Sequence, residues 1–396
     1  MTVPPARAGH ISRRGLLATV VALGAATSSC RTSSESEATP APEVVAHLAA
    51  AWAEAVTAGD RDRFDRVWTG SPERLTTLWD NLTGLGLSSF AVAGEPTLDD
   101  PRTAQLRVQW QVPGDRAPAS HLLGVPVSGR GSDARLDVGT RAEVGAGPYP
   151  LWWLEPVRTS TADGVRVISG ALGPLADTVA ATAATSLAEA VRLTGLPSSG
   201  VVLELPSTPQ LMDRVLGDDR GSTGQIGALT WPAGPRVTEA PLRIVLNPLA
   251  MAADDEARRA LLTHEITHVL TAAPERGVPL WVAEGYAELV AHDHDPDAGW
   301  RSAEPFLALL REGRSEPAPP GDDAFLGSEL EVAYGQAWTL CRWLLEQSSW
   351  ERVNHWYAAL GEGAAMDDAL QELCGRDLTG VQAGWQQWLS ERIEER

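Results

Sequence analysis

Two histidines and a glutamate lie close together in the segment ADDEARRALLTHEITHVLTAAP, at His264, Glu265 and His268. On an α-helix, residues four positions apart are separated by ~6 Å along the axis and lie on nearly the same face. The spacing therefore directs both imidazoles toward one point, where they could bind a single metal ion. Glu265 falls on the neighbouring face, where a carboxylate can act as a general base for water without being a ligand.

The following segment, PLWVAEGYAELVAH, contains two further carboxylates, Glu284 and Glu288. Pro279 is suited to the start of a helix, and glutamates four positions apart then share one face. A catalytic zinc site needs three protein ligands and one open position, so Glu284 is predicted to be the third ligand. Two imidazoles and one carboxylate favour Zn²⁺, one ion per chain, although related ions suit the same ligands.

HEITH and WVAEGYAE together resemble the gluzincin peptidases, the superfamily that includes thermolysin, and more narrowly the peptidase MA-like group of exported bacterial proteins. The resemblance covers about residues 170–396 and implies zinc-dependent hydrolysis of peptide bonds. It implies that Glu284, in its Glu-Gly step, binds zinc and that Glu288 orients a ligating histidine. It also implies that Tyr334, in AYGQA, stabilises the oxyanion, although a tyrosine packed in the core is the alternative.

Other interpretations of these residues remain open. The main alternative function is a zinc-containing binding or assembly protein that cleaves no peptides, but Glu265 argues against it because a structural zinc needs no base. The cluster His292-Asp293-His294-Asp295 is a candidate second metal site. Consecutive residues point in different directions, so a surface loop is favoured there. The strand LRIVLNP (242–248) is a candidate edge strand along which a peptide substrate would lie.

The elements that must position these residues follow from the periodicity of apolar side chains. Helical spacing begins at residue 43 and returns from about residue 172, on either side of a stretch of short alternating segments. Turn residues separate these alternating segments, as in antiparallel sheets. The predicted strands are 104–112, 121–127, 134–144, 164–170, 200–206, 224–231 and 242–248.

This order predicts an α+β fold with two domains. Residues 43–170 form a small helix-plus-antiparallel-sheet domain, and residues 171–396 form a mainly helical zincin-like metallopeptidase domain with a small sheet. The order of elements in the first domain resembles the nuclear-transport-factor-2-like cone fold. That resemblance places LWWLEPV (151–157) in an aromatic strand.

The first thirty residues are typical of an export signal. Adjacent arginines precede an apolar run, Leu16 to Ala26, that is too short for a good membrane span. SRRGLL resembles a twin-arginine motif, and TSSC resembles a lipoprotein cleavage site with Cys30 as the lipidated residue. Such sites prefer Leu where Thr27 stands, so lipidation and release by cleavage both remain open. Residues 31–42, rich in Ser, Thr, Glu and Pro, are predicted to be a disordered tether.

Location and partners follow from these features and from the charge. The mature protein is expected in the cell envelope, lipid-anchored on the outer face of the cytoplasmic membrane, with secretion as the second choice. The chain has 52 acidic and 32 basic residues, a net charge of −20, which argues against a nucleic-acid partner. A peptide or protein substrate is expected, and the oligomeric state is not indicated. Cys341 and Cys374 could pair in an oxidising compartment or remain buried thiols.

Overall fold

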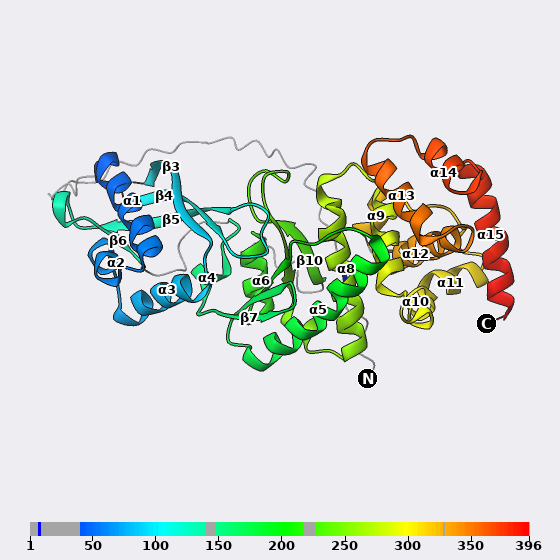
Figure 1. The fold of residues 1–396 in the computed structure, drawn as a ribbon, viewed down its shortest axis with the longest axis horizontal. Coiled ribbons are helices and arrows are strands. Elements are labelled where there is room, and N and C mark those ends of the chain that lie inside the picture. Colours follow the sequence, from blue (N-terminus) through cyan, green and yellow to red (C-terminus); the bar gives the residue numbers. More distant parts are fainter. Residues whose placement is uncertain are drawn as a thin grey trace, which may run out of the picture.

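The computed structural model describes residues 7–8, 40–100, 102–139, 147–217, 226–327 and 329–395 (Figure 1). Cys30 lies outside these residues, as does the predicted tether up to residue 39. No helix within the described ranges is both long and apolar enough to cross a membrane. The architecture is α+β, with two small sheets and a mainly helical C-terminal half, as predicted.

Three helices lead into a five-stranded sheet in the first half of the chain, coloured blue to cyan in Figure 1. Asp60 and Ser71 begin α2 and α3, because their side chains accept hydrogen bonds from backbone N–H groups three residues later. The sheet has the order β2-β6-β5-β4-β3, and side chains alternate between buried and more exposed along β4. The elements are α1 (Pro42–Ala58), α2 (Arg61–Val67), β2 (Trp68–Thr69), α3 (Pro72–Gly84), β3 (Ser89–Asp100), β4 (Thr103–Gln111), β5 (Ala119–Ser128), η1 (Gly131–Asp133) and β6 (Arg135–Asp137).

A second, six-stranded sheet has the order β1-β10-β11-β9-β8-β7. β8, β9 and β11 are parallel neighbours, whereas β7 and β10 pair antiparallel with β8 and β11. The strands are β1 (Arg7–Ala8), β7 (Arg158–Ala162), β8 (Val165–Ser169), β9 (Val201–Leu205), β10 (Ile226–Pro232) and β11 (Leu242–Leu246). This mixed sheet supports the helices of the C-terminal half.

The second sheet begins earlier in the chain than the sequence indicates. The strand predicted at 164–170 belongs to this sheet and not to the first domain, because Val165 of β8 pairs with Val201 of β9. The predicted boundary at residue 170 therefore falls within the sheet. Alternation of apolar residues indicates that a strand exists but does not identify its partner, which explains the difference.

Two local predictions are wrong. The segment 151–157 was expected to be an aromatic strand, but Leu151–Leu154 forms the short helix α4 with all four side chains buried. A run of four apolar residues is compatible with either structure. The predicted edge strand at 242–248 is β11, which lies inside the sheet between β10 and β9. Within the described ranges, only β1 lies beyond β10.

The six-stranded sheet separates two apolar cores. Along β9, Leu203 faces the core that includes α5 (Gly173–Thr194) and α8 (Asp255–Thr271), whereas Val202 faces the core of the first half. The first half therefore packs against one face of the sheet, and the long helices α5 and α8 pack against the other (Figure 1).

A buried arginine joins the two halves. Arg243 of β11 donates hydrogen bonds to Asp115, in the turn between β4 and β5, at 2.6 Å and to Glu204 of β9 at 2.8 Å. Its guanidinium lies 3.9 Å from the ring centroid of Trp110, and the arginine side chain is fully buried. Such a charge is stable in the interior only when it is paired, so this contact connects the first half firmly to the sheet.

Helices make up most of the described residues after β11, which are coloured green to red in Figure 1. Cys341 and Cys374 are both free thiols in the structure, and the first is buried. The remaining elements are α6 (Pro209–Leu216), α7 (Pro248–Met251), η4 (Ala273–Glu275), α9 (Leu280–Ala291), α10 (Pro296–Ser302), α11 (Glu304–Arg311), η5 (Asp322–Phe325), α12 (Leu330–Glu346), α13 (Trp350–Gly361), α14 (Met366–Cys374) and α15 (Leu378–Glu395).

Candidate metal centre

Helix α8 carries the HExxH segment. The side chain of Asp254 begins this helix by accepting a hydrogen bond from the backbone N–H of Ala257 at 2.9 Å. His264, Glu265 and His268 are all buried, with exposed fractions of 1%, 2% and 3%. Buried imidazoles and a buried carboxylate are costly unless a partner satisfies them, so these residues require partners from another element.

Glu284 of α9 supplies that partner. The Nε2 atoms of His264 and His268 are 2.9 Å apart, and they lie 3.2 and 3.4 Å from Oε2 of Glu284. Ligands bound to a tetrahedral zinc ion at ~2.0–2.2 Å would be about 3.3 Å from one another, so the three donor atoms fit around one such ion. Among the residues that the structure describes, they form one group with the composition and spacing of a metal site.

The electrostatics of this group favour a cation. Burial by itself would raise the pKa of Glu284, but the imidazoles of His268 and His264 outweigh it and hold that pKa well below its ordinary value. Burial would likewise lower the pKa of His264, but the carboxylates of Glu284 and Glu288 outweigh it and hold that pKa well above its ordinary value. The site therefore stabilises positive charge at the point where the three donor atoms meet.

Glu265 is held beside the donor group by a residue that the sequence analysis missed. Its Oε2 lies 2.6 Å from the hydroxyl oxygen of Thr230, in β10, and this hydroxyl also lies 3.1 Å from the backbone carbonyl oxygen of Glu265. Burial raises the pKa of Glu265, and the nearby imidazoles and the hydrogen bond from Thr230 oppose that rise without cancelling it. A carboxylate with a raised pKa, oriented beside a metal site, is suited to accept a proton from water.

The sequence contains one signal that could have identified Thr230. It is the polar residue within the apolar strand segment GALTW, directly before the hairpin that leads toward the HExxH helix. The side chain of Thr230 is only 3% exposed. A buried hydroxyl needs a hydrogen-bond partner, so a partner on the helix that covers this strand was to be expected.

Glu288 contacts His264 on the side of the ring that faces away from Glu284. Its Oε1 lies 2.9 Å from His264 Nδ1, the ring nitrogen that does not face Glu284. Burial would raise the pKa of Glu288, but contacts with His264 and His292 outweigh it and lower that pKa. An ionised carboxylate at this nitrogen fixes the orientation and the tautomer of the imidazole.

The cluster predicted as a surface loop has a buried member. His292 is 8% exposed, and its Nε2 lies 3.1 Å from the second oxygen of Glu288. Asp293 instead forms an ion pair with Arg192 at 3.3 Å. In the described ranges, residues 292–295 do not form a second metal-ligand group.

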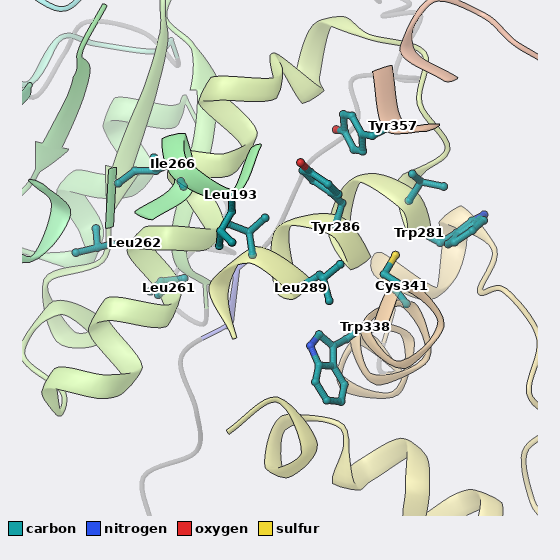
Figure 2. Close-up of a cluster of buried hydrophobic side chains, with 14 of the residues drawn as sticks. Leu193, Leu261, Leu262, Ile266, Trp281, Tyr286, Leu289, Trp338, Cys341 and Tyr357 are labelled. Atoms are coloured by element: carbon teal, nitrogen blue, oxygen red, sulfur yellow. The ribbon is translucent and has the colours of Figure 1, made fainter. Parts of the chain in front are cut away.

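Close packing of α9 and α12 brings Tyr334 to the site. Figure 2 shows buried side chains from α8, α9 and α12 packed together, among them Ile266, Tyr286 and Cys341. A Cβ on Gly285 would lie 2.6 Å from the carbonyl oxygen of Ala337, so glycine at this position permits the two helices to approach. Helix α12, which carries Tyr334, therefore reaches the group of donor atoms.

Tyr334 lies over the donor group. Its ring centroid is 6.0 Å from that of His264, and Phe325 packs edge-to-face against it at 5.5 Å. Burial raises the pKa of Tyr334 well above its ordinary value, and the carboxylates of Glu284, Glu288 and Glu265 raise it further. The phenol therefore keeps its proton and can donate a hydrogen bond.

Part of the chain is similar to a known protein family. No curated protein matches the chain. Residues 240–391 match the family model of the Peptidase MA superfamily. The matched region begins just before β11 and includes both ligand-bearing helices, α12 and most of α15. By this match, the C-terminal half of the chain, which contains the His-His-Glu group, resembles the peptidases of the Peptidase MA superfamily.

Proposed function

We propose that the protein is a zinc metallopeptidase of the gluzincin type, with one Zn²⁺ held by His264, His268 and Glu284. The observation that carries the proposal is the group of three buried donor atoms, 2.9–3.4 Å apart, with Glu265 beside it. The ligand set leaves one position open, as a catalytic zinc requires. When bound, the ion would supply Lewis-acid polarisation of the scissile carbonyl and acidification of water.

The protein's own side chains then have distinct tasks. Glu265 takes the proton of the attacking water and delivers it to the leaving amine, while Thr230 holds the carboxylate in place. The protonated phenol of Tyr334 donates a hydrogen bond to the substrate oxygen on which negative charge develops. Glu288 keeps His264 oriented throughout.

The buried Thr230–Glu265 contact favours an enzyme over the alternative, a zinc-containing binding or assembly protein. A zinc ion with a purely structural role is satisfied by its ligands and needs no oriented carboxylate beside it. Here Glu265 is buried at a cost and fixed by a hydroxyl from another element. That arrangement contributes to catalysis and adds nothing to metal retention.

The proposal also covers the leader and the first half of the chain. The basic and apolar leader, with Cys30 at its end, supports export and attachment by lipid to the outer face of the cytoplasmic membrane. Three helices together with a five-stranded sheet support a nuclear-transport-factor-2-like cone for the first half. We expect this half to stabilise the sheet behind the metal site, since Arg243 and Asp115 connect the two.

The test measures metal content and cleavage of a quenched mixed-peptide library by the protein without its leader. Wild type should hold about one zinc per chain and cleave. Glu284→Ala should lose the metal and cleavage, whereas Glu265→Gln should keep the metal and lose cleavage. His355→Ala, which changes an exposed histidine, is the control and should resemble wild type.

Three results would contradict the proposal. A wild-type protein that holds no metal removes the central claim. Metal that remains in Glu284→Ala would show that this carboxylate is not a ligand. Full occupancy of wild type without any peptide cleavage would instead favour the binding protein.

A further inference from the structure

The carboxylate of Glu288 lies between two imidazoles. Its Oε1 is 2.9 Å from His264 Nδ1, and its Oε2 is 3.1 Å from His292 Nε2. A carboxylate held through one oxygen can still rotate about its last side-chain bond, because that torsion is broad. Contacts at both oxygens fix its plane. His292 therefore determines how Glu288 presents its first oxygen to His264.

His292 is itself fixed in place. Its backbone N–H donates to the carbonyl oxygen of Glu288 at 3.0 Å, which ends α9 directly after the residues that face the site. The ring packs edge-to-face against Trp338, with centroids 6.3 Å apart. Trp338 lies on α12, one turn after Tyr334, and also contacts Trp300 at 5.2 Å. The imidazole is thus held between its own helix and the helix that covers the site.

A pocket of about 400 Å³ adjoins this pair and is lined in part by His264, Glu288 and His292. The cation in its lining, Arg301, donates to Glu256 at 3.0 Å and to Asp295 at 3.2 Å. Both bonds come from its Nη2 atom and go to carboxylates other than Glu288. His292 is accordingly the donor that the structure provides for the second oxygen of Glu288.

We propose that His292 is a positioning residue for the metal centre, acting through Glu288 on His264. The inference rests on the proposed function, because it takes His264 as a zinc ligand. Partners outside the ligand set typically change metal affinity by about 10- to 100-fold. His292 is one contact further from the metal than such partners. We therefore expect its loss to lower zinc affinity about tenfold, at the lower end of that range.

Two substitutions separate positioning from packing. His292→Phe keeps a ring against Trp338 but removes the donor, whereas His292→Gln keeps an amide N–H near the position of Nε2 but loses the ring. If His292 positions Glu288, zinc affinity measured by competition with a chelator falls about tenfold in His292→Phe and stays near wild type in His292→Gln. The visible spectrum of the Co²⁺-substituted protein should change in the same variant, because it reports ligand geometry.

His294→Phe is the matched control, since it makes the same change two residues away, and it should bind zinc as wild type does. If His292→Phe binds zinc like wild type while His292→Gln is impaired, His292 serves packing and the inference is overturned. Equal zinc affinity in all variants overturns it as well, and the proposed function stands in both cases. A wild-type protein without metal removes the proposed function and this inference together.

Discussion

The hydroxyl of Thr230 lies 2.6 Å from the carboxylate of Glu265, which links the six-stranded sheet to the helix that carries the HExxH segment. Thr230 belongs to β10, and Glu265 to α8, and both side chains are almost completely buried. The helix spacing alone places Glu265 beside the donor group. The hydrogen bond from the sheet then selects one orientation of its carboxylate.

Thr230→Val is expected to slow cleavage without releasing the metal. Valine has nearly the same shape but no hydroxyl, and a hydrogen bond to a charged group contributes about 1.5–3 kcal/mol. We therefore expect kcat to fall about 10- to 100-fold, with unchanged zinc content. Thr230→Ser retains the hydroxyl and should restore most of the rate. A Val variant as active as wild type would show that the contact does not orient the base.

Tyr334→Phe distinguishes an oxyanion donor from a core residue. Phenylalanine keeps the edge-to-face contact with Phe325 and removes only the phenol. Loss of one oxyanion donor typically lowers kcat by about 10²–10³-fold, and we expect that decrease with little change in KM or zinc content. If Tyr334 serves only in packing, Tyr334→Phe should instead match wild type in kcat. The two proteins should then differ at most in thermal stability.

Arg243→Met is expected to destabilise the whole protein by about 3–5 kcal/mol, because it leaves Asp115 and Glu204 as unpaired buried carboxylates. Burial raises the pKa of Glu204 even with its partner present. The free energy of unfolding in urea measures the effect.

Arg236→Met is the matched control, since Arg236 pairs with Glu239 on the surface, where their side chains are 73% and 63% exposed. Such exposed pairs contribute about 0–1 kcal/mol. Similar losses in both variants would contradict this account.

The sequence predicted the parts of the site that depend on spacing within one helix. His264 and His268 share a face because they are four positions apart, and Glu284 and Glu288 do so for the same reason. The structure brings both faces together at distances of 2.9–3.4 Å. Whether these residues bind zinc stays a prediction for the experiments above.

Features that depend on contacts between distant segments could not be predicted. Thr230 reaches Glu265 because β10 packs against α8, and the ring of buried His292 packs against Trp338 of α12. Local polarity in the HDHD segment indicates an exposed loop, and no periodicity identifies a covering helix. The same limit applies to β8, whose alternation is visible in the sequence whereas its pairing with β9 is not.

His121 makes stability depend on pH, independently of the metal centre. Burial, with a smaller contribution from the charge of Arg243, lowers its pKa to about 3. Trp110 Nε1 donates to His121 Nδ1 at 3.3 Å, which requires a neutral imidazole. The unfolded chain binds a proton near the ordinary pKa of about 6.5 and the folded protein does not. Stability from the neutral ring is therefore complete above pH 6.5 and is lost as the pH falls toward 3.

The expected loss for His121 between pH 7 and pH 5 is about 2 kcal/mol. His121→Asn keeps an acceptor for Trp110 but does not titrate, so its free energy of unfolding should fall by that much less over the same interval. Urea unfolding at the two pH values, with a chelator present so that both proteins are metal-free, measures the difference. The other carboxylates and histidines titrate in both proteins, so their contributions to the change in the free energy of unfolding cancel in the comparison. Equal losses in wild type and variant would mean that His121 becomes protonated within the fold, and that the first half admits a second positive charge beside Arg243.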